Sequence, residues 1–186
     1  MSLETKNAVI LHGSGETPDS FWLPYARRGL EVKGYSVSIP QLPDAEEPVL
    51  GKWLSAALQE GYTERTVVIG HSAGVPLTLS VLENLDVRIR QAILVAGFSS
   101  PLPDDHGENP ILQQHYNWRR IGEGVDDIIF INSDNDPWGC DDKQGRQMLD
   151  SLGKGTLIIR MGEGHMGSDR FNQPYREFPF LLKLVD

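Results

Sequence analysis

The stretch Val67-Val68-Ile69-Gly70-His71-Ser72-Ala73-Gly74 decides the fold that this chain is expected to adopt. It opens with β-branched apolar residues, which are typical of a buried parallel strand, and runs into apolar residues at helical spacing. Between them lies Gly-x-Ser-x-Gly, the pattern of a nucleophile elbow, in which a serine occupies a sharp turn from strand to helix. Gly70 and Gly74 stand where a side chain would collide with the neighbouring strand or helix. Such a turn exposes the Ser72 hydroxyl and aims the backbone N–H of Ala73 at the point of attack.

Short apolar strands alternate with helical patterns along the rest of the chain. The expected strands are 8–11, 35–39, 66–69, 92–96, 128–131 and 157–161; the expected helices are 22–32, 49–58, one after the elbow, 142–152 and 174–184. This alternation predicts one α/β domain over residues 1–186, with a parallel sheet and helices on both faces. Sheets of this kind bind ligands at the carboxyl ends of their strands.

Residues 97–125 interrupt the alternation. They carry no strand signal, several prolines and a group of acidic residues, although residues 111–121 could form a short helix. A long excursion after a strand is typical of a small cap or active-site lid. A surface loop with a connecting helix explains the same pattern equally well, and the sequence favours neither interpretation.

Composition and charge argue against some partners and cellular locations. The chain has 186 residues and a net charge of −9, which disfavours nucleic acid as a partner because nucleic-acid binding needs a basic surface. Its one cysteine, Cys140, cannot form an intrachain disulfide, so a reducing, cytoplasmic compartment is expected. The apolar run 8–11 is too short for a signal peptide, and no run approaches transmembrane length, so no membrane association is expected.

A serine hydroxyl is a weak nucleophile that needs a neighbouring base, and the base needs an orienting acid. In a nucleophile-elbow fold the acid and then the histidine follow later strands. Asp136 follows the strand 128–131 and precedes a proline, and we favour it over Asp134, which suits a turn. His165 follows the last strand, between glycines, and is the predicted general base.

The other histidines are weaker candidates. His12 and His71 lie too near the ends of strands to bridge a serine and an acid, and His106 and His115 fall in the irregular region, where they are expected to be solvated. No His-x-x-x-His or paired-cysteine spacing is present, so no metal site is predicted.

A second oxyanion donor, beside the Ala73 amide, is expected from the loop after the first strand. The backbone N–H of Ser14 is the candidate, with Gly15 close behind. The aromatic residues Trp22, Phe98 and Trp138 follow the first, fourth and fifth strands. They would line an apolar acyl pocket or pack in the core, and both interpretations stay open.

At these residues the chain resembles the α/β-hydrolases, and more narrowly the small single-domain serine hydrolases of the retinoblastoma-binding and YdeN-like type. The resemblance spans nearly the whole chain, and its anchors are His12-Gly13 with Trp22, the elbow 70–74, Asp136-Pro137 and Gly164-His165. It implies a sheet of about six parallel strands in order 2-1-3-4-5-6, a compact cap and no cofactor. The loop 14–19 departs from the family by being more polar and acidic.

The leading hypothesis is a serine hydrolase that cleaves a small ester, thioester or activated amide through an acyl-enzyme, with Ser72, His165 and Asp136 as its triad. Its partner would be a small-molecule acyl substrate, neutral or cationic because the chain is acidic. One alternative is a protein-binding module on a hydrolase scaffold with little catalysis. Another is an acyltransferase or peptidase that uses the same residues.

Overall fold

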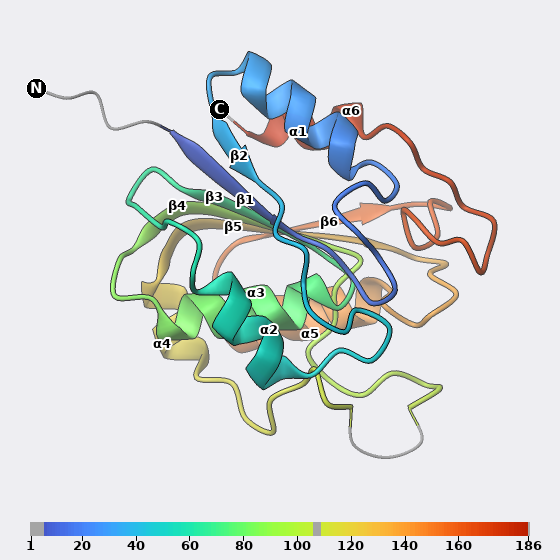
Figure 1. The fold of residues 1–186 in the computed structure, drawn as a ribbon. Helices are drawn as coiled ribbons and strands as arrows, with labels where there is room; N and C mark the ends of the chain where they lie inside the picture. Colours follow the sequence, from blue (N-terminus) through green and yellow to red (C-terminus); the bar gives the residue numbers. More distant parts are fainter. Residues whose placement is uncertain (1–5, 106–108, 186) are drawn as a thin grey trace, which may run out of the picture.

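The apolar segments of the sequence assemble into a single parallel sheet of six strands in the computed structural model, which describes residues 6–105 and 109–185 (Figure 1). The strands are β1 (Asn7–Leu11), β2 (Ser36–Ser38), β3 (Val67–His71), β4 (Ile89–Val95), β5 (Val125–Ser133) and β6 (Thr156–Arg160). Their spatial order, β2-β1-β3-β4-β5-β6, confirms the prediction. The four central strands are almost continuously buried and apolar, as a sheet covered on both faces requires.

Helices cover both faces of the sheet and make a three-layer α/β structure. Figure 1 shows α1 (Leu23–Val32) and α6 (Pro179–Leu184) on one face, and α2 (Leu50–Ala57), α3 (Gly74–Asn84), α4 (Trp118–Glu123) and α5 (Asp142–Leu152) on the other. Nearly all of α3 is buried, because it lies centrally over the sheet. No helix in the described part of the chain is long and apolar enough to cross a membrane.

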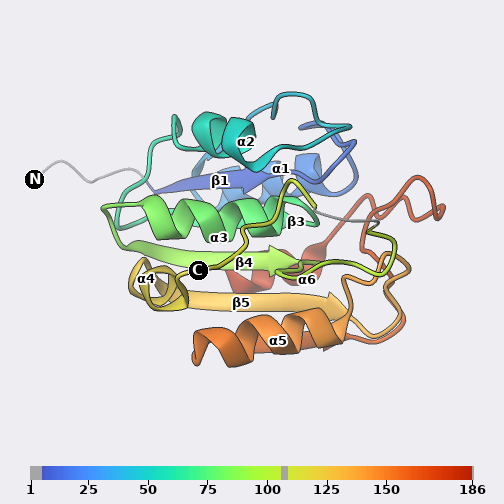
Figure 2. The same cartoon turned by 90° about the horizontal axis from the view of Figure 1, so that it is seen from below.

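All six strands point the same way, so the loops that follow them gather at one edge of the sheet (Figure 2). The register brings the strand ends level: His71 pairs with Val95, and Val95 with Ile131. Segments far apart in the sequence therefore meet beyond the carboxyl ends of β1, β3, β4, β5 and β6, where a ligand site was predicted.

Two helices differ from the sequence-based prediction. The helix expected at 111–121 begins at Trp118, because the side chain of Asn117 accepts a hydrogen bond from the Arg120 backbone N–H and caps that end. The helix expected at 174–184 begins at Pro179, because Tyr175 has φ 35°, in the left-handed region, which a right-handed helix does not allow. The described residues of 97–117 contain no strand, and the idea of a lid there stays a prediction.

Candidate active site

Ser72 sits at the turn between β3 and α3, in the left-handed conformation with φ 53°. Its N–H donates to the Val95 carbonyl at 2.9 Å, which holds the turn against the end of β4. A Cβ at Gly70 would lie 2.6 Å from Thr78 Oγ1 and 2.7 Å from the Gly74 carbonyl, and a Cβ at Gly74 would collide with the Leu11 carbonyl. The two glycines therefore allow a strained serine to stand at this place.

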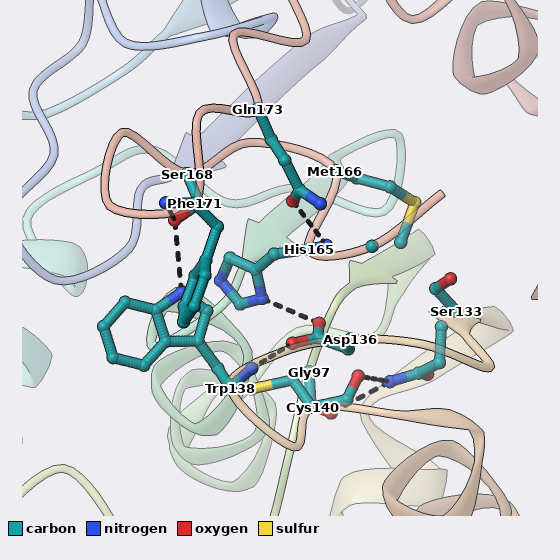
Figure 3. A network of polar contacts seen from close by, with 12 residues as sticks. Gly97, Ser133, Asp136, Trp138, Cys140, His165, Met166, Ser168, Phe171 and Gln173 are labelled. Carbon is teal, nitrogen blue, oxygen red and sulfur yellow. Dashed lines mark hydrogen bonds and ion pairs between the residues drawn. The ribbon is translucent and has the colours of Figure 1, made fainter. Parts of the chain in front are cut away.

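Asp136 and His165 meet across the loops that follow β5 and β6. The Asp136 Oδ2 atom lies 2.7 Å from His165 Nδ1, and both side chains are buried (Figure 3). The other carboxylate oxygen accepts the Trp138 backbone N–H at 2.8 Å, so the carboxyl group cannot turn away from the imidazole. The competing acid, Asp134, is exposed and accepts the Gly162 backbone N–H at 2.7 Å.

The main chain of His165 is held as firmly as its ring. Its N–H donates to Gln173 Oε1 at 2.8 Å, and its carbonyl accepts from His71 Nε2 at 3.1 Å. Because Nδ1 is bonded to Asp136, the remaining ring nitrogen, Nε2, is the one available for a reacting partner.

A cavity of about 620 Å³ opens beside these residues. Of the predicted site residues, those that line it are Ser14, Ser72, Ala73, Phe98, Trp138 and His165, with Asp136 behind the imidazole. Trp22 is not among the lining residues: it is fully buried, and its indole N–H donates to the Met166 carbonyl at 2.9 Å. For Trp22 the structure thus supports the core alternative.

The loop after β1 presents two amides near the elbow. The Gly15 N–H already donates to the Ala45 carbonyl at 2.8 Å, so it is engaged. Ser14 and Gly15 both line the same cavity as Ser72, so it is the engagement of the Gly15 amide that leaves Ser14 as the oxyanion candidate.

Two buried histidines have structural partners that the sequence did not reveal. His12 bridges the Gly13 carbonyl at 2.9 Å and the Leu42 N–H at 3.0 Å, and burial lowers its pKa, which keeps the ring neutral. His71 pairs with Glu16, which the sequence marks only as a member of the acidic loop 14–19. Their contact joins residues 55 positions apart, and no local pattern marks it. His115 is exposed, and His106 lies outside the described residues.

One group of side chains in the described part of the chain has the spacing of metal ligands: Asp136, Cys140 and His165, whose ligand atoms lie within 4.8 Å of one another. Asp136 and His165 are already joined to each other by a hydrogen bond of 2.7 Å. Burial raises the pKa of the Cys140 thiol well above its usual value, so the thiol keeps its proton and is a poor ligand. We therefore attribute this group to the carboxylate–imidazole pair and assign no metal.

A parallel sheet of this order, with a strained serine between β3 and α3, defines the α/β-hydrolase class. The model of the serine hydrolase family matches residues 8–184, and the chain belongs to that family.

Individual relatives agree with this assignment. YdeN of Bacillus subtilis is 29% identical over 136 residues, 71% of this chain and 72% of YdeN. The serine hydrolase RBBP9 of Rattus norvegicus is 26% identical over 98% of both chains. The crystal structure of the B. subtilis ydeN gene product superposes with a TM-score of 0.88 over 97% of both chains, at 24% identity. Est1E of Butyrivibrio proteoclasticus shares the fold with a TM-score of 0.69, covering 98% of this chain and 87% of Est1E, at 13% identity.

Proposed function

We propose that this chain hydrolyses a small ester, thioester or activated amide through a covalent acyl-enzyme, with Ser72 as nucleophile. One observation carries the proposal: a buried imidazole, held by a carboxylate at 2.7 Å, lines the same cavity as a serine at the tip of a nucleophile elbow. Membership of the serine hydrolase family supports the same reaction class.

In this mechanism Ser72 Oγ attacks the substrate carbonyl while His165 Nε2 takes the hydroxyl proton. Asp136 fixes the tautomer that has its proton on Nδ1, and its charge stabilises the imidazolium that forms. The amides of Ala73 and Ser14 donate to the oxyanion, and each such donor is worth roughly 3 kcal/mol in the transition state. His165 then protonates the leaving group, and a water molecule, deprotonated by the same imidazole, releases the acid.

The cavity favours a small acyl substrate that is neutral or cationic. Its volume of about 620 Å³ suits a small molecule, and Phe98 and Trp138 give it apolar walls. Beyond the paired Glu16, its lining includes the acidic residues Glu46, Asp104, Asp105 and Asp169, against one arginine, Arg170. Like charge lowers the encounter rate of an anionic substrate. We expect the reaction to take place in a reducing, cytoplasmic compartment, since Cys140 is free and buried.

Labelling with a fluorophosphonate probe, together with turnover of short-chain esters, tests this proposal. We expect the protein to be labelled and active, and Ser72→Ala to abolish both. His165→Ala should reduce turnover by at least about 10³-fold, as expected for loss of a triad base. The matched controls are Ser151→Ala and His115→Ala, which change exposed residues outside the cavity and should leave both measurements intact.

Labelling that persists in Ser72→Ala would refute the nucleophile. Absence of both labelling and turnover in the unaltered protein, together with a stable complex with another protein, would favour the protein-binding module instead. Transfer of the acyl group to an added amine or alcohol in preference to water would identify an acyltransferase.

A further inference from the structure

A second carboxylate–imidazole pair lies buried directly behind the nucleophile. Glu16 Oε1 is 2.7 Å from His71 Nδ1, and the two side chains are 6% and 0% exposed. His71 is the residue before Ser72, and Glu16 belongs to the loop that carries the oxyanion candidate Ser14. The mechanism above uses neither side chain.

The Glu16–His71 pair connects three segments whose relative positions matter for the reaction: the loop after β1, the Ser72 elbow and the loop that carries His165. Glu16 Oε2 accepts the Gly13 backbone N–H at 2.9 Å, which shapes the loop after β1. His71 Nε2 lies 3.1 Å from the His165 carbonyl, which ties the elbow to the loop of the general base. The backbone of Gly13 packs closely against both Glu16 and the elbow, since a Cβ at Gly13 would lie 2.6 Å from Glu16 Oε1 and 2.9 Å from Ser72 Cβ.

The partners of His71 fix its protonation. A backbone carbonyl can only accept, so His71 Nε2 carries a proton and donates it to the His165 carbonyl. The Glu16 carboxylate likewise only accepts hydrogen bonds, so Nδ1 also carries a proton and donates to it, and with both nitrogens protonated the ring is a cation. Burial lowers the pKa of His71, but the charge and hydrogen bond of Glu16 outweigh it and raise the pKa. Burial likewise raises the pKa of Glu16, and His71 more than reverses that change.

Neighbouring groups make the arrangement rigid. Phe21 and Trp22 pack edge-on against the His71 ring, with centroids 6.2 and 5.6 Å away. Trp22 also holds the carbonyl of Met166, the residue after the general base. His71, Trp22 and Gln173 thus hold the main chain of 165–166, while Asp136 holds the imidazole.

We propose that Glu16 and His71 are positioning residues of this hydrolase, which lock the oxyanion loop and the His165 main chain against the Ser72 elbow. The inference rests on the proposed function. His71 is fully buried and lies outside the cavity lining, so it acts through Ser72 and His165 and not by contact with substrate. Glu16 does line the cavity, but its two carboxylate oxygens are bound by His71 and by the Gly13 N–H, so it too acts through the protein. Removing one partner of a buried ion pair also lowers stability, because the other charge is left unpaired, so a change in stability alone does not reveal a role in catalysis. The effect that distinguishes a positioning role is a change in the rate of the chemical step, measured on protein shown to be folded.

The test compares Glu16→Ala with Glu16→Gln in steady-state ester hydrolysis. Glutamine can accept the Gly13 N–H with its oxygen and donate to His71 Nδ1 with its amide, while a neutral His71 still donates from Nε2 to the His165 carbonyl. Alanine removes these contacts. We expect Glu16→Ala to lower kcat by roughly 10- to 100-fold, the cost of a small misplacement of reacting groups, with KM changed by less than about threefold. Glu16→Gln should recover most of the lost kcat.

The control is Glu47→Ala, which removes an exposed carboxylate outside the cavity lining and should leave kcat unchanged. Thermal unfolding of each variant confirms that the protein assayed is folded; Glu16→Gln keeps the test available if Glu16→Ala does not fold. The positioning role is overturned if Glu16→Ala has the kcat of the unaltered protein. It is also overturned if Glu16→Gln is no faster than Glu16→Ala. If Glu16→Ala does not fold, a folded Glu16→Gln protein whose kcat is reduced more than tenfold overturns it.

These failures are distinct from failure of the proposed function. If the unaltered protein labels at Ser72 and turns over ester while the Glu16 variants match it, only the positioning role is lost. If the unaltered protein neither labels nor turns over, both proposals are overturned together.

Discussion

Asp136 and His165 are 29 residues apart in the sequence, yet a hydrogen bond of 2.7 Å joins Asp136 Oδ2 to His165 Nδ1. The bond selects one tautomer of the imidazole, with its proton on Nδ1 and a free lone pair on Nε2. The Trp138 backbone N–H donates to the second carboxylate oxygen. The turn that follows β5 therefore fixes the orientation of the carboxylate, and with it the tautomer of His165.

Asp136→Asn is expected to lower kcat by about 10⁴-fold, because an amide can donate to Nδ1 and stabilise the wrong tautomer. Asp134→Asn is the matched control: that side chain is exposed and needs only an acceptor for the Gly162 N–H, which asparagine retains. Steady-state ester hydrolysis measures both variants. A larger loss of kcat in Asp134→Asn would assign the triad acid to Asp134. Equal losses of kcat in the two variants would contradict the assignment to Asp136.

The parallel sheet and the elbow could be predicted from sequence because both depend on local signals. Continuous β-branched strands identify a sheet buried on two faces, and Gly-x-Ser-x-Gly encodes one turn. The strand order was implied by the resemblance to the α/β-hydrolases, and Asp136 and His165 were found because in that fold the acid and the base follow later strands. The Glu16–His71 pair could not be found in this way, because it depends on how the β1 loop packs on the elbow.

Two helix boundaries were also missed. Residues 111–121 were considered a possible short helix, but the helix that forms begins where Asn117 caps it with a single hydrogen bond from the Arg120 N–H. The early part of 174–184 is irregular, because Tyr175 has φ 35°, which a right-handed helix does not allow. A local cap sets the first of these boundaries, and backbone conformation sets the second.

Gly74→Ala should destabilise the fold by about 2–4 kcal/mol, because the new Cβ would strike the backbone of Leu11 and His12, which cannot move without disturbing β1. Gly51→Ala is the control, since its Cβ would enter open space on α2 and should stabilise the protein by about 0.5–1 kcal/mol. Urea unfolding gives both free energies. A loss at Gly74 no larger than the change at Gly51 would contradict the close packing of the elbow.

Trp22→Phe separates the two interpretations of this aromatic residue. The variant leaves the Met166 carbonyl without its indole donor, so we expect a loss of about 1–3 kcal/mol in the free energy of unfolding, with KM little changed. Trp138→Ala, which removes a wall of the cavity, should instead raise KM for apolar acyl esters. A large rise in KM for Trp22→Phe without loss of stability would return Trp22 to the substrate pocket.

The pH dependence of stability should carry the signature of the Glu16–His71 pair. The folded protein lowers the pKa of Glu16 below its ordinary 4.5, so this contribution is present above pH 4.5 and is lost as pH falls through the lowered value. It raises the pKa of His71 above 6.5, so that contribution is complete below pH 6.5 and is lost as pH rises through the raised value. Both act together between pH 4.5 and 6.5.

Glu16→Gln removes the ion pair but keeps the hydrogen bonds, so its loss of stability relative to the unaltered protein should be largest within that window and shrink at alkaline pH. His12, whose pKa burial lowers, opposes stability on acidification, but it is present in both proteins and largely cancels in the difference. Urea unfolding at pH 5.5, 7 and 9 measures the two curves. A difference that does not vary with pH would mean that His71 is neutral in the folded protein and that the pair is held by hydrogen bonding alone.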